Sequence, residues 1–241
     1  MLTLGKNMLS IRELAVDYGG IAALRKVSLE VGENEIVSVI GANGGGKTTL
    51  LRSISGVLAR VSGRIDFCGE RINGLPPHEI CGRGLIQVPE GRQLFLRMKV
   101  IENLEMGAYQ AAARKDLRRS LERVFALFPV LKERQKQKSG LMSGGEQQML
   151  AIARALMSKP RLLMLDEPSE GLSPVLTANV FATLRQLQAQ GLSILLVSQE
   201  VAQSLGLSGR AYVLENGQIV LQGKSSDLLN DEKVRESYLG V

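Results

Sequence analysis

The 241-residue chain contains no tryptophan, one histidine and two cysteines, and aromatic residues make up only 4% of it. Cys68 and Cys81 lack the spacing of a metal-binding pair and have no histidine cluster nearby, so the sequence favours buried or surface thiols over a metal site or a disulfide. The single histidine, His78, stands in a proline-containing turn at 76–79, where a surface position is expected. Chemistry based on histidine or cysteine is therefore not expected.

Long hydrophobic runs are absent too. No apolar stretch of the sequence approaches the roughly 18 residues that a membrane span requires. Residues 1–7 lack the charged start, the long apolar stretch and the cleavage site of a secretory signal. With 44% hydrophobic and 22% charged residues, the composition is that of an ordinary globular protein, which we expect to stay in the cytoplasm.

The formal net charge of +6 at pH 7 raises the question of a nucleic-acid or membrane-surface partner. Much of the excess lies in residues 114–119 and 132–138. Acidic residues and glutamines interrupt both stretches, and neither contains an aromatic residue on which a base could stack. The pattern favours solvated helix faces, so no nucleic-acid partner is expected.

Residues 41–48, GANGGGKT, match the phosphate-loop pattern G-x-x-x-x-G-K-[ST] at every position. An apolar run at 36–40, indicating a buried strand, precedes the loop, and a helix is predicted after it. In such a loop the main-chain N–H groups surround a phosphate, the lysine adds a mobile cation and the hydroxyl can join a Mg²⁺ shell. A ligand-free corner of an α/β sheet is the alternative, but it explains neither the lysine nor the hydroxyl. The pattern predicts nucleotide-binding residues at Gly41, Asn43, Gly44, Gly45, Gly46, Lys47, Thr48 and Thr49.

A second apolar run, at 162–165, ends in two consecutive carboxylates, Asp166 and Glu167. A carboxylate at the end of a strand can hold the Mg²⁺ shell, and the next one can face an attacking water. Such a pair alone is a weak signal. Because it follows a phosphate loop in the same chain, it predicts phosphoryl-transfer chemistry.

Ser143 and Glu146 form an S-x-x-E capping box, which predicts a helix from Ser143 to about Leu156. A well-capped structural helix is one reading of this segment. Gly144 and Gly145 argue against it, because glycine loses more backbone entropy in a helix than alanine. Two glycines after the cap suit N–H groups that approach a phosphate closely. A head-to-tail pair of chains would let each such segment complete the partner's phosphate loop.

The order of predicted elements indicates an α/β protein. Strands are expected at 11–16, 24–31, 36–40 and 63–67, and residues 101–157 follow a mostly helical pattern. A strand at 162–165, a helix at 174–190, a strand at 193–197 and a hairpin through Asn216-Gly217 come next. This alternation of strands and helices is typical of a doubly wound sheet, here interrupted by a helical lobe within one compact unit.

Together these motifs resemble the ATP-binding cassette (ABC) family over nearly the whole chain. The motifs that support this resemblance are the phosphate loop at 41–48, the signature at 143–147, the Walker B strand at 162–166 with Glu167, and a D-loop at 168–174. The resemblance implies an α/β P-loop NTPase fold with an N-terminal antiparallel β subdomain. It implies a single domain at 8–241, with a core at about 8–90 and 160–241 and an inserted helical subdomain at about 91–159. The family's usual start resembles Met8 to Ser10, so residues 1–7 would be an N-terminal extension.

Segments 88–92, 97–104, 142–151 and 238–240 narrow the resemblance to the ATPase subunits of branched-chain amino-acid importers, of the LivF type. The resemblance implies ATP and Mg²⁺ as ligands and a second ABC ATPase subunit, in a homodimer or a heterodimer. It also implies hydrophobic permease subunits, an indirect extracytoplasmic binding protein and a peripheral place on the cytoplasmic face of the inner membrane, with a chain that is soluble when expressed alone. Urea or amide importers and lipopolysaccharide-export cassettes share much of this pattern. A cassette ATPase that acts on nucleic acid or ribosomes is a further alternative.

The resemblance also implies residue roles. Tyr18 would stack on adenine, although a strand-end tyrosine is the alternative. Glu90 stands where most cassettes carry a glutamine that reaches Mg²⁺ and water, and Gln199 stands where they carry a histidine. An amide at that position can donate an N–H but cannot titrate. The resemblance assigns catalysis to Glu167, Lys47, Gln199 and Glu90, Mg²⁺ to Thr48, Asp166 and Glu90, and contact with the partner's nucleotide to Ser143, Gly144, Gly145 and Glu146.

Overall fold

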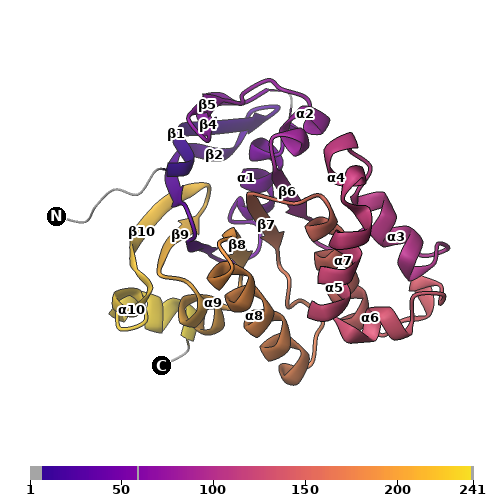
Figure 1. Cartoon of the computed structure of the whole chain (residues 1–241). Coiled ribbons are helices and arrows are strands. Elements are labelled where there is room, and N and C mark those ends of the chain that lie inside the picture. Colours follow the sequence, from indigo (N-terminus) through magenta and orange to yellow (C-terminus); the bar gives the residue numbers. More distant parts are fainter. Residues whose placement is uncertain (1–6, 59, 240–241) are drawn as a thin grey trace.

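The computed structural model describes residues 7–58 and 60–239, which form two sheets and a layer of helices (Figure 1). The first sheet is antiparallel and has the strand order β2-β1-β4-β5. It is the N-terminal antiparallel layer that the family resemblance implies. Its strands are β1 (Asn7–Tyr18), β2 (Ile21–Gly32), β4 (Ser62–Phe67) and β5 (Glu70–Arg71). Asn7 pairs with Gly32, whereas the rest of the predicted extension, residues 1–6, lies outside the described residues.

The second sheet has the order β10-β9-β3-β8-β7-β6. Strands β9, β3, β8, β7 and β6 run parallel, and β10 pairs antiparallel with β9. The strands are β3 (Ile36–Ile40), β6 (Leu85–Val88), β7 (Leu162–Asp166), β8 (Ser193–Ser198), β9 (Arg210–Glu215) and β10 (Gln218–Lys224). In open α/β sheets, ligands bind outside the carboxyl ends of the parallel strands. The phosphate loop, Glu90, Asp166 and Gln199 all lie at these ends, on four adjacent strands.

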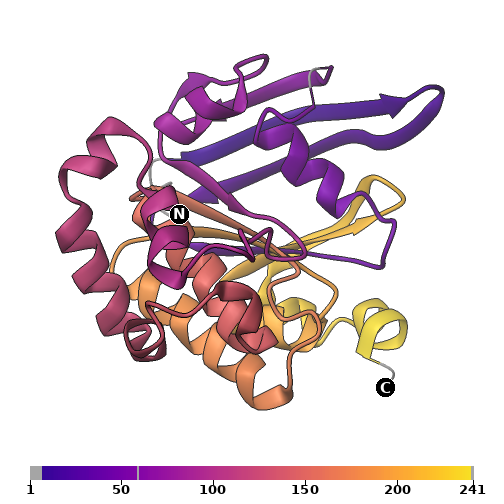
Figure 2. The same cartoon turned by 90° about the vertical axis from the view of Figure 1, so that its right-hand side faces the viewer.

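The core is divided by the six-stranded sheet. Along β7, Leu163 and Leu165 face one apolar cluster, and Leu162 and Met164 face another, as the alternation of side chains along a strand requires. The second cluster also contains α1 (Lys47–Ile54), which packs between the two sheets. Figure 2 shows the four-stranded sheet as a separate layer over the six-stranded one.

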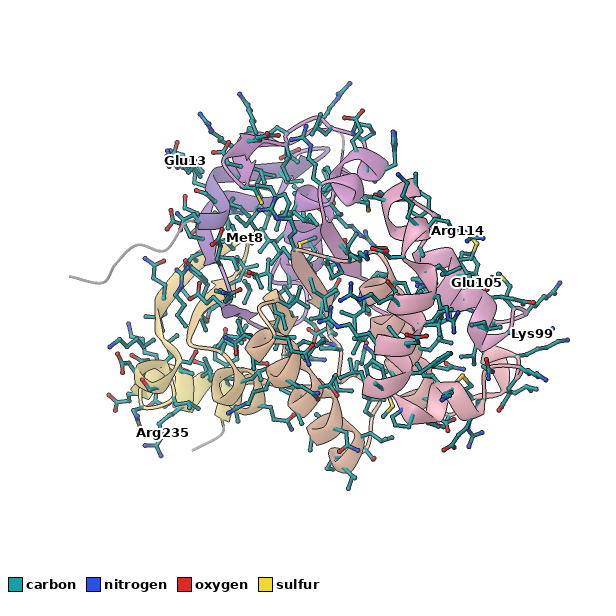
Figure 3. The ribbon with its side chains drawn as sticks, in the orientation of Figure 1. Met8, Glu13, Lys99, Glu105, Arg114 and Arg235 are labelled. Atoms are coloured by element: carbon teal, nitrogen blue, oxygen red, sulfur yellow. The ribbon has the colours of Figure 1, made fainter. Side chains whose placement is uncertain are left out.

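Helices cover the other face of the six-stranded sheet (Figure 1). The predicted helical region at 101–157 is divided into α3 (Val100–Gly107), α4 (Ala111–Lys115), α5 (Leu117–Leu127), α6 (Pro129–Glu133), a 3-10 turn η1 (Ser139–Leu141) and α7 (Gly144–Met157). The apolar side of α5 packs inward, with Val124 and the following Phe128 buried. Lys99 and Arg114 point outward at the edge of this layer (Figure 3), and the exposure of Arg114 agrees with the solvated helix face expected at 114–119.

The remaining helices complete the core and its edge. They are α2 (Pro77–Gly82), α8 (Pro174–Ala189), α9 (Val201–Leu207), α10 (Ser225–Leu228), α11 (Glu232–Val234) and a terminal π-helical turn η2 (Arg235–Leu239). The sequence did not predict β6 as a strand, since an apolar run of this length fits a strand or a helix equally well. Within the described ranges, no helix is long and apolar enough to cross a membrane.

Candidate functional site

The phosphate loop connects β3 to α1 and is fixed from outside by the β9–β10 hairpin. A β carbon on Gly41 would lie 2.1 Å from the carbonyl oxygen of Leu214, so only glycine lets β9 pass this close. At the other end of the loop, the N–H of Gly217 donates to the carbonyl oxygen of Gly45 at 3.0 Å. The path of the loop is therefore set by packing against the hairpin.

Lys47 begins α1 and is only 5% exposed. Its Nζ donates to the carbonyl oxygens of Gly41 (2.9 Å) and Ala42 (3.1 Å). It also lies 3.2 Å from Oε1 of Glu167, in an ion pair between two largely buried side chains. Three oxygens thus hold the ammonium group, which would have to exchange at least one of them to contact a phosphate.

Glu167 follows β7 in a left-handed conformation, with φ 46, which is uncommon for a residue other than glycine. Its main-chain N–H donates to the carbonyl oxygen of Val197 at 2.9 Å, and its Oε2 accepts from the main-chain N–H of Gln199 at 3.0 Å. Together with the contact to Lys47, these bonds engage both carboxylate oxygens. The geometry fixes the direction of the carboxylate, and Gln199 contributes through its backbone.

Asp166, the last residue of β7, is 2% exposed, and neither of its carboxylate oxygens has a hydrogen-bond partner among the described residues. Burial raises the pKa of Asp166 to about 6, the nearby Thr48 hydroxyl opposes that shift, and the Glu90 and Glu167 carboxylates add to it. Buried oxygens without a partner, next to a hydroxyl, suit a hard cation such as Mg²⁺. The part of the chain described here has no cluster of three or more His, Cys, Asp or Glu side chains that could hold a metal ion. A Mg²⁺ ion here would therefore depend on phosphate oxygens and water as further ligands, as is usual for this ion.

A cavity of about 540 Å³ opens in front of the phosphate loop. It brings together the predicted residues Asn43, Gly44, Gly46, Lys47, Thr48, Thr49, Glu90, Glu167 and Gln199. Sequence reasoning missed its other lining residues, Ile21, Ala22, Ala23, Arg25, Glu170, Asn216 and Gly217. Asn216-Gly217 was visible in the sequence only as a turn, and nothing local places that turn over the loop.

Tyr18 is not among the residues that line this cavity. It is 47% exposed at the end of β1 and pairs across the hairpin with Ile21, which does line the cavity. Its ring is therefore at the end of the hairpin that borders the site. The predictions of adenine stacking and of a strand-end tyrosine are both compatible with that position.

The predicted capping box at the start of α7 is confirmed. Ser143 Oγ accepts the N–H of Glu146 (3.4 Å), and Glu146 Oε2 accepts the N–H of Ser143 (2.9 Å). A β carbon on Gly145 would lie 2.6 Å from Cδ1 of Leu176, so close packing against α8 is a second reason for that glycine. In the described chain none of Ser143, Gly144, Gly145 and Glu146 lines the cavity that contains Lys47.

The fold and the cavity define a phosphate-loop nucleotide-binding protein of the α/β class. Residues 24–170 match the family model described as ABC transporter, and the chain belongs to this family as an ATP-binding cassette, an enzyme that hydrolyses ATP. It is 49% identical to the high-affinity branched-chain amino acid transport ATP-binding protein BraG of Pseudomonas aeruginosa, over 97% of this chain and 100% of that protein. It is 36% identical to a probable branched-chain amino acid transport ATP-binding protein, LivF, of Archaeoglobus fulgidus, over 97% and 99% of the two chains.

Solved structures give the same assignment. The ADP conformation of MJ1267, an ATP-binding cassette of an ABC transporter, superposes with a TM-score of 0.84 at 28% identity, covering 98% of this chain and 99% of that chain. The predicted family and fold class are confirmed.

Proposed function

We propose that this chain is the ATP-hydrolysing subunit of an importer for branched-chain amino acids. The observation that carries the proposal is the 49% identity that extends over the full length of a branched-chain amino acid transport ATP-binding protein. The LivF-type segments of the sequence, at 88–92, 97–104, 142–151 and 238–240, support the same subgroup.

In this proposal the phosphate loop, Lys47 and Thr49 bind the phosphates of ATP, and Tyr18 stacks on its adenine. Glu167 polarises the attacking water, because its carboxylate direction is fixed by Lys47 and by the backbone of Gln199. Gln199, after β8, would donate an amide N–H toward the terminal phosphate, and Glu90, after β6, would stand near Mg²⁺ and the attacking water; both line the cavity.

Thr48, Asp166 and Glu90 would hold Mg²⁺, and the unpartnered oxygens of Asp166 support this assignment. A Mg²⁺ ion held there would neutralise part of the negative charge of the phosphate groups. The Thr48 hydroxyl and the Asp166 carboxylate come from adjacent elements, α1 and β7, which fixes one against the other.

Hydrolysis requires a second cassette in this proposal. Ser143, Gly144, Gly145 and Glu146 would contact the nucleotide of a paired ABC ATPase subunit, identical or related, in a head-to-tail arrangement. ATP then touches both subunits only when the pair is closed, so its binding favours closure and its hydrolysis allows reopening. The helices at 91–159, as an inserted subdomain of the single cassette at 8–241, would pass this movement to hydrophobic permease subunits at the cytoplasmic face of the inner membrane. An extracytoplasmic binding protein would deliver the amino acid.

The test is ATP hydrolysis by the assembled transporter. The chain would be co-expressed with its second cassette, its permeases and its binding protein, and reconstituted in vesicles with either leucine or urea as cargo. We expect leucine-loaded binding protein to stimulate hydrolysis several-fold and Glu167→Gln to abolish it. Stimulation by urea or an amide, or membrane retention only with lipopolysaccharide-export permeases, would contradict the cargo class. Membrane retention independent of any permease would contradict the transport role.

A further inference from the structure

The chain makes an unusual turn immediately after Glu90. Three consecutive residues adopt left-handed backbone conformations, with φ 70 at Gly91, 64 at Arg92 and 45 at Gln93. Glycine tolerates this region, whereas arginine and glutamine do not adopt it readily. Strained conformations of this kind persist only where the surroundings hold them, and they concentrate at functional sites.

The signature helix α7 holds this turn in place. Arg154, near the end of α7, donates from Nη1 to the carbonyl oxygen of Gln93 (2.8 Å) and from Nη2 to that of Arg92 (3.1 Å). Its guanidinium also lies over the ring of Phe95, 5.5 Å from the centroid. The turn and the helix that carries the signature therefore form one hydrogen-bonded unit.

Held in this way, the Arg92 side chain reaches the N-terminus of α7. A β carbon on Gly144, the first residue of that helix, would lie 3.3 Å from Nη2 of Arg92. A β carbon on Gly171, in the predicted D-loop, would lie 4.0 Å from the same atom. The guanidinium thus stands between the start of α7, which the proposed function directs toward a paired subunit, and the predicted D-loop.

The electrostatics of this position are unfavourable in the isolated chain. A helix N-terminus carries partial positive charge, and Arg92 adds a full positive charge beside it. No acidic side chain within the described residues forms an ion pair with Arg92, and its Nη1 makes one long hydrogen bond, 3.3 Å, to Oε1 of Gln147. Glu146, the acid in the first turn, is already engaged by the N–H of Ser143 and by Arg134. An anion placed here would contact the guanidinium and the amides of the helix at once.

We propose that Arg92 is a binding residue for the terminal phosphate of the ATP held by the paired cassette, next to the amides of Gly144 and Gly145. This inference rests on the proposed function, because it requires that the signature of one subunit meet the nucleotide of the other. A guanidinium can offer two parallel N–H donors to a phosphate, which an ammonium group cannot do.

The test uses the full chain carrying Glu167→Gln, the variant expected to hold ATP without hydrolysis, alone and co-expressed with the second cassette of its transporter. Two quantities are measured: the affinity of the unpaired chain for ATP, by titration at low protein concentration, and ATP-driven association, by light scattering. We expect Arg92→Gln to weaken association about tenfold or more. The affinity of the unpaired chain for ATP should stay within about twofold of the parent, because Arg92 is not among the residues that line the chain's own cavity. Arg92→Lys should restore only part of the association, since it keeps the charge and loses the fork geometry.

Arg97→Gln is the matched control, since Arg97 is an exposed arginine of the same loop and forms no ion pair with a described residue. Association of the Arg92→Gln variant at the parent's affinity would overturn the inference and leave the proposed function intact. A parent that binds ATP but associates with neither copy nor second cassette would overturn the paired arrangement itself, and the role of Arg92 with it. Equal loss in Arg92→Gln and Arg97→Gln would show a general charge effect and would also refute the inference.

Discussion

Replacing Glu167 by glutamine should make the nucleotide-free chain less stable and should tighten its binding of ATP. The reason is the ion pair with Lys47, in which Nζ and Oε1 are 3.2 Å apart and both side chains are less than a tenth exposed. At an effective dielectric constant of about 20, the Coulomb attraction at this distance is about 5 kcal/mol. The net contribution is smaller, because both groups lost their hydration when they were buried.

The variant leaves Lys47 with the carbonyl oxygens of Gly41 and Ala42, so its charge is not without partners. We therefore expect the free energy of unfolding to fall by about 1–3 kcal/mol, less than the about 3–5 kcal/mol typical of a broken buried pair. For a chain of this size that corresponds to a Tm about 3–10 °C lower. A neutral amide also removes the repulsion between a carboxylate and the phosphates and releases Lys47 from its strongest partner. ATP affinity should then rise about tenfold, which adds about 1.4 kcal/mol of stabilisation at a given excess of ATP.

The assay is thermal unfolding of wild type and variant over an ATP titration, with hydrolysis followed in parallel. Glu170→Gln is the matched control, because Glu170 lines the same cavity, is exposed and pairs with no cation among the described residues. It should change the unfolding free energy by less than about 0.5 kcal/mol. The reasoning fails if Glu167→Gln leaves both the nucleotide-free Tm and the ATP affinity unchanged, or if Glu170→Gln reproduces its effects.

Three further predictions concern groups whose packing is equally specific. Burial raises the folded-state pKa of Asp166 to about 6. The nucleotide-free chain should therefore lose stability as pH rises from about 4 to about 6, by up to about 3 kcal/mol. Urea unfolding in EDTA should show that Asp166→Asn is more stable than wild type at pH 7.5 and has no such advantage at pH 4. Gly41→Ala places a carbon 2.1 Å from the carbonyl oxygen of Leu214, so nucleotide titration should show at least a tenfold loss of ATP affinity, and retained affinity would contradict a packed loop. Burial and a 2.6 Å hydrogen bond to Glu215 raise the pKa of Tyr238. The contribution of Tyr238 to the stability of the fold is therefore present below about pH 10 and lost as pH rises further. In urea unfolding, Tyr238→Phe should lower the unfolding free energy by about 1 kcal/mol at pH 8 and remove that alkaline loss.

Features that depend on neighbouring residues in the chain were predictable from the sequence. Strand β3 has the bounds that the apolar run at 36–40 indicated, and Ser143 caps α7 as the S-x-x-E pattern predicted. Both depend on interactions within a few residues, which the sequence displays directly. The division of the helical region at 101–157 was not predicted, because its breaks depend on how each short helix packs.

The part of the site that sequence reasoning missed comes from contacts between distant segments. The carbonyl oxygen of Leu214 limits Gly41, and Gly217 binds the loop through Gly45, although each pair is far apart in the chain. No local sequence pattern indicates either contact. A long-range contact of this kind follows from the order of strands, which places β9 next to β3.

The left-handed backbone conformations at residues other than glycine could not be predicted from the sequence either. Glu167 and Arg92 both adopt it, and neither glutamate nor arginine suggests it by type. In each case hydrogen bonds from another element hold the conformation: Val197 accepts the N–H of Glu167, and Arg154 donates to the carbonyl of Arg92. The left-handed conformation of both residues is thus held by contacts from outside their own segments, which is why the neighbouring sequence does not indicate it.

The division of the core explains why this cassette would need a partner. Helix α1, with the phosphate loop before it, belongs to the apolar cluster between the two sheets, whereas α7 belongs to the cluster on the opposite face of the six-stranded sheet. The start of α7 cannot reach Lys47 of its own chain without a rearrangement across that sheet, because its residues at 150–157 are buried in the far cluster. On the proposed function, a triphosphate that needs both segments can obtain them only from two chains. The free energy of binding the triphosphate would then stabilise the contact between the two subunits, and closure of that contact could move a permease.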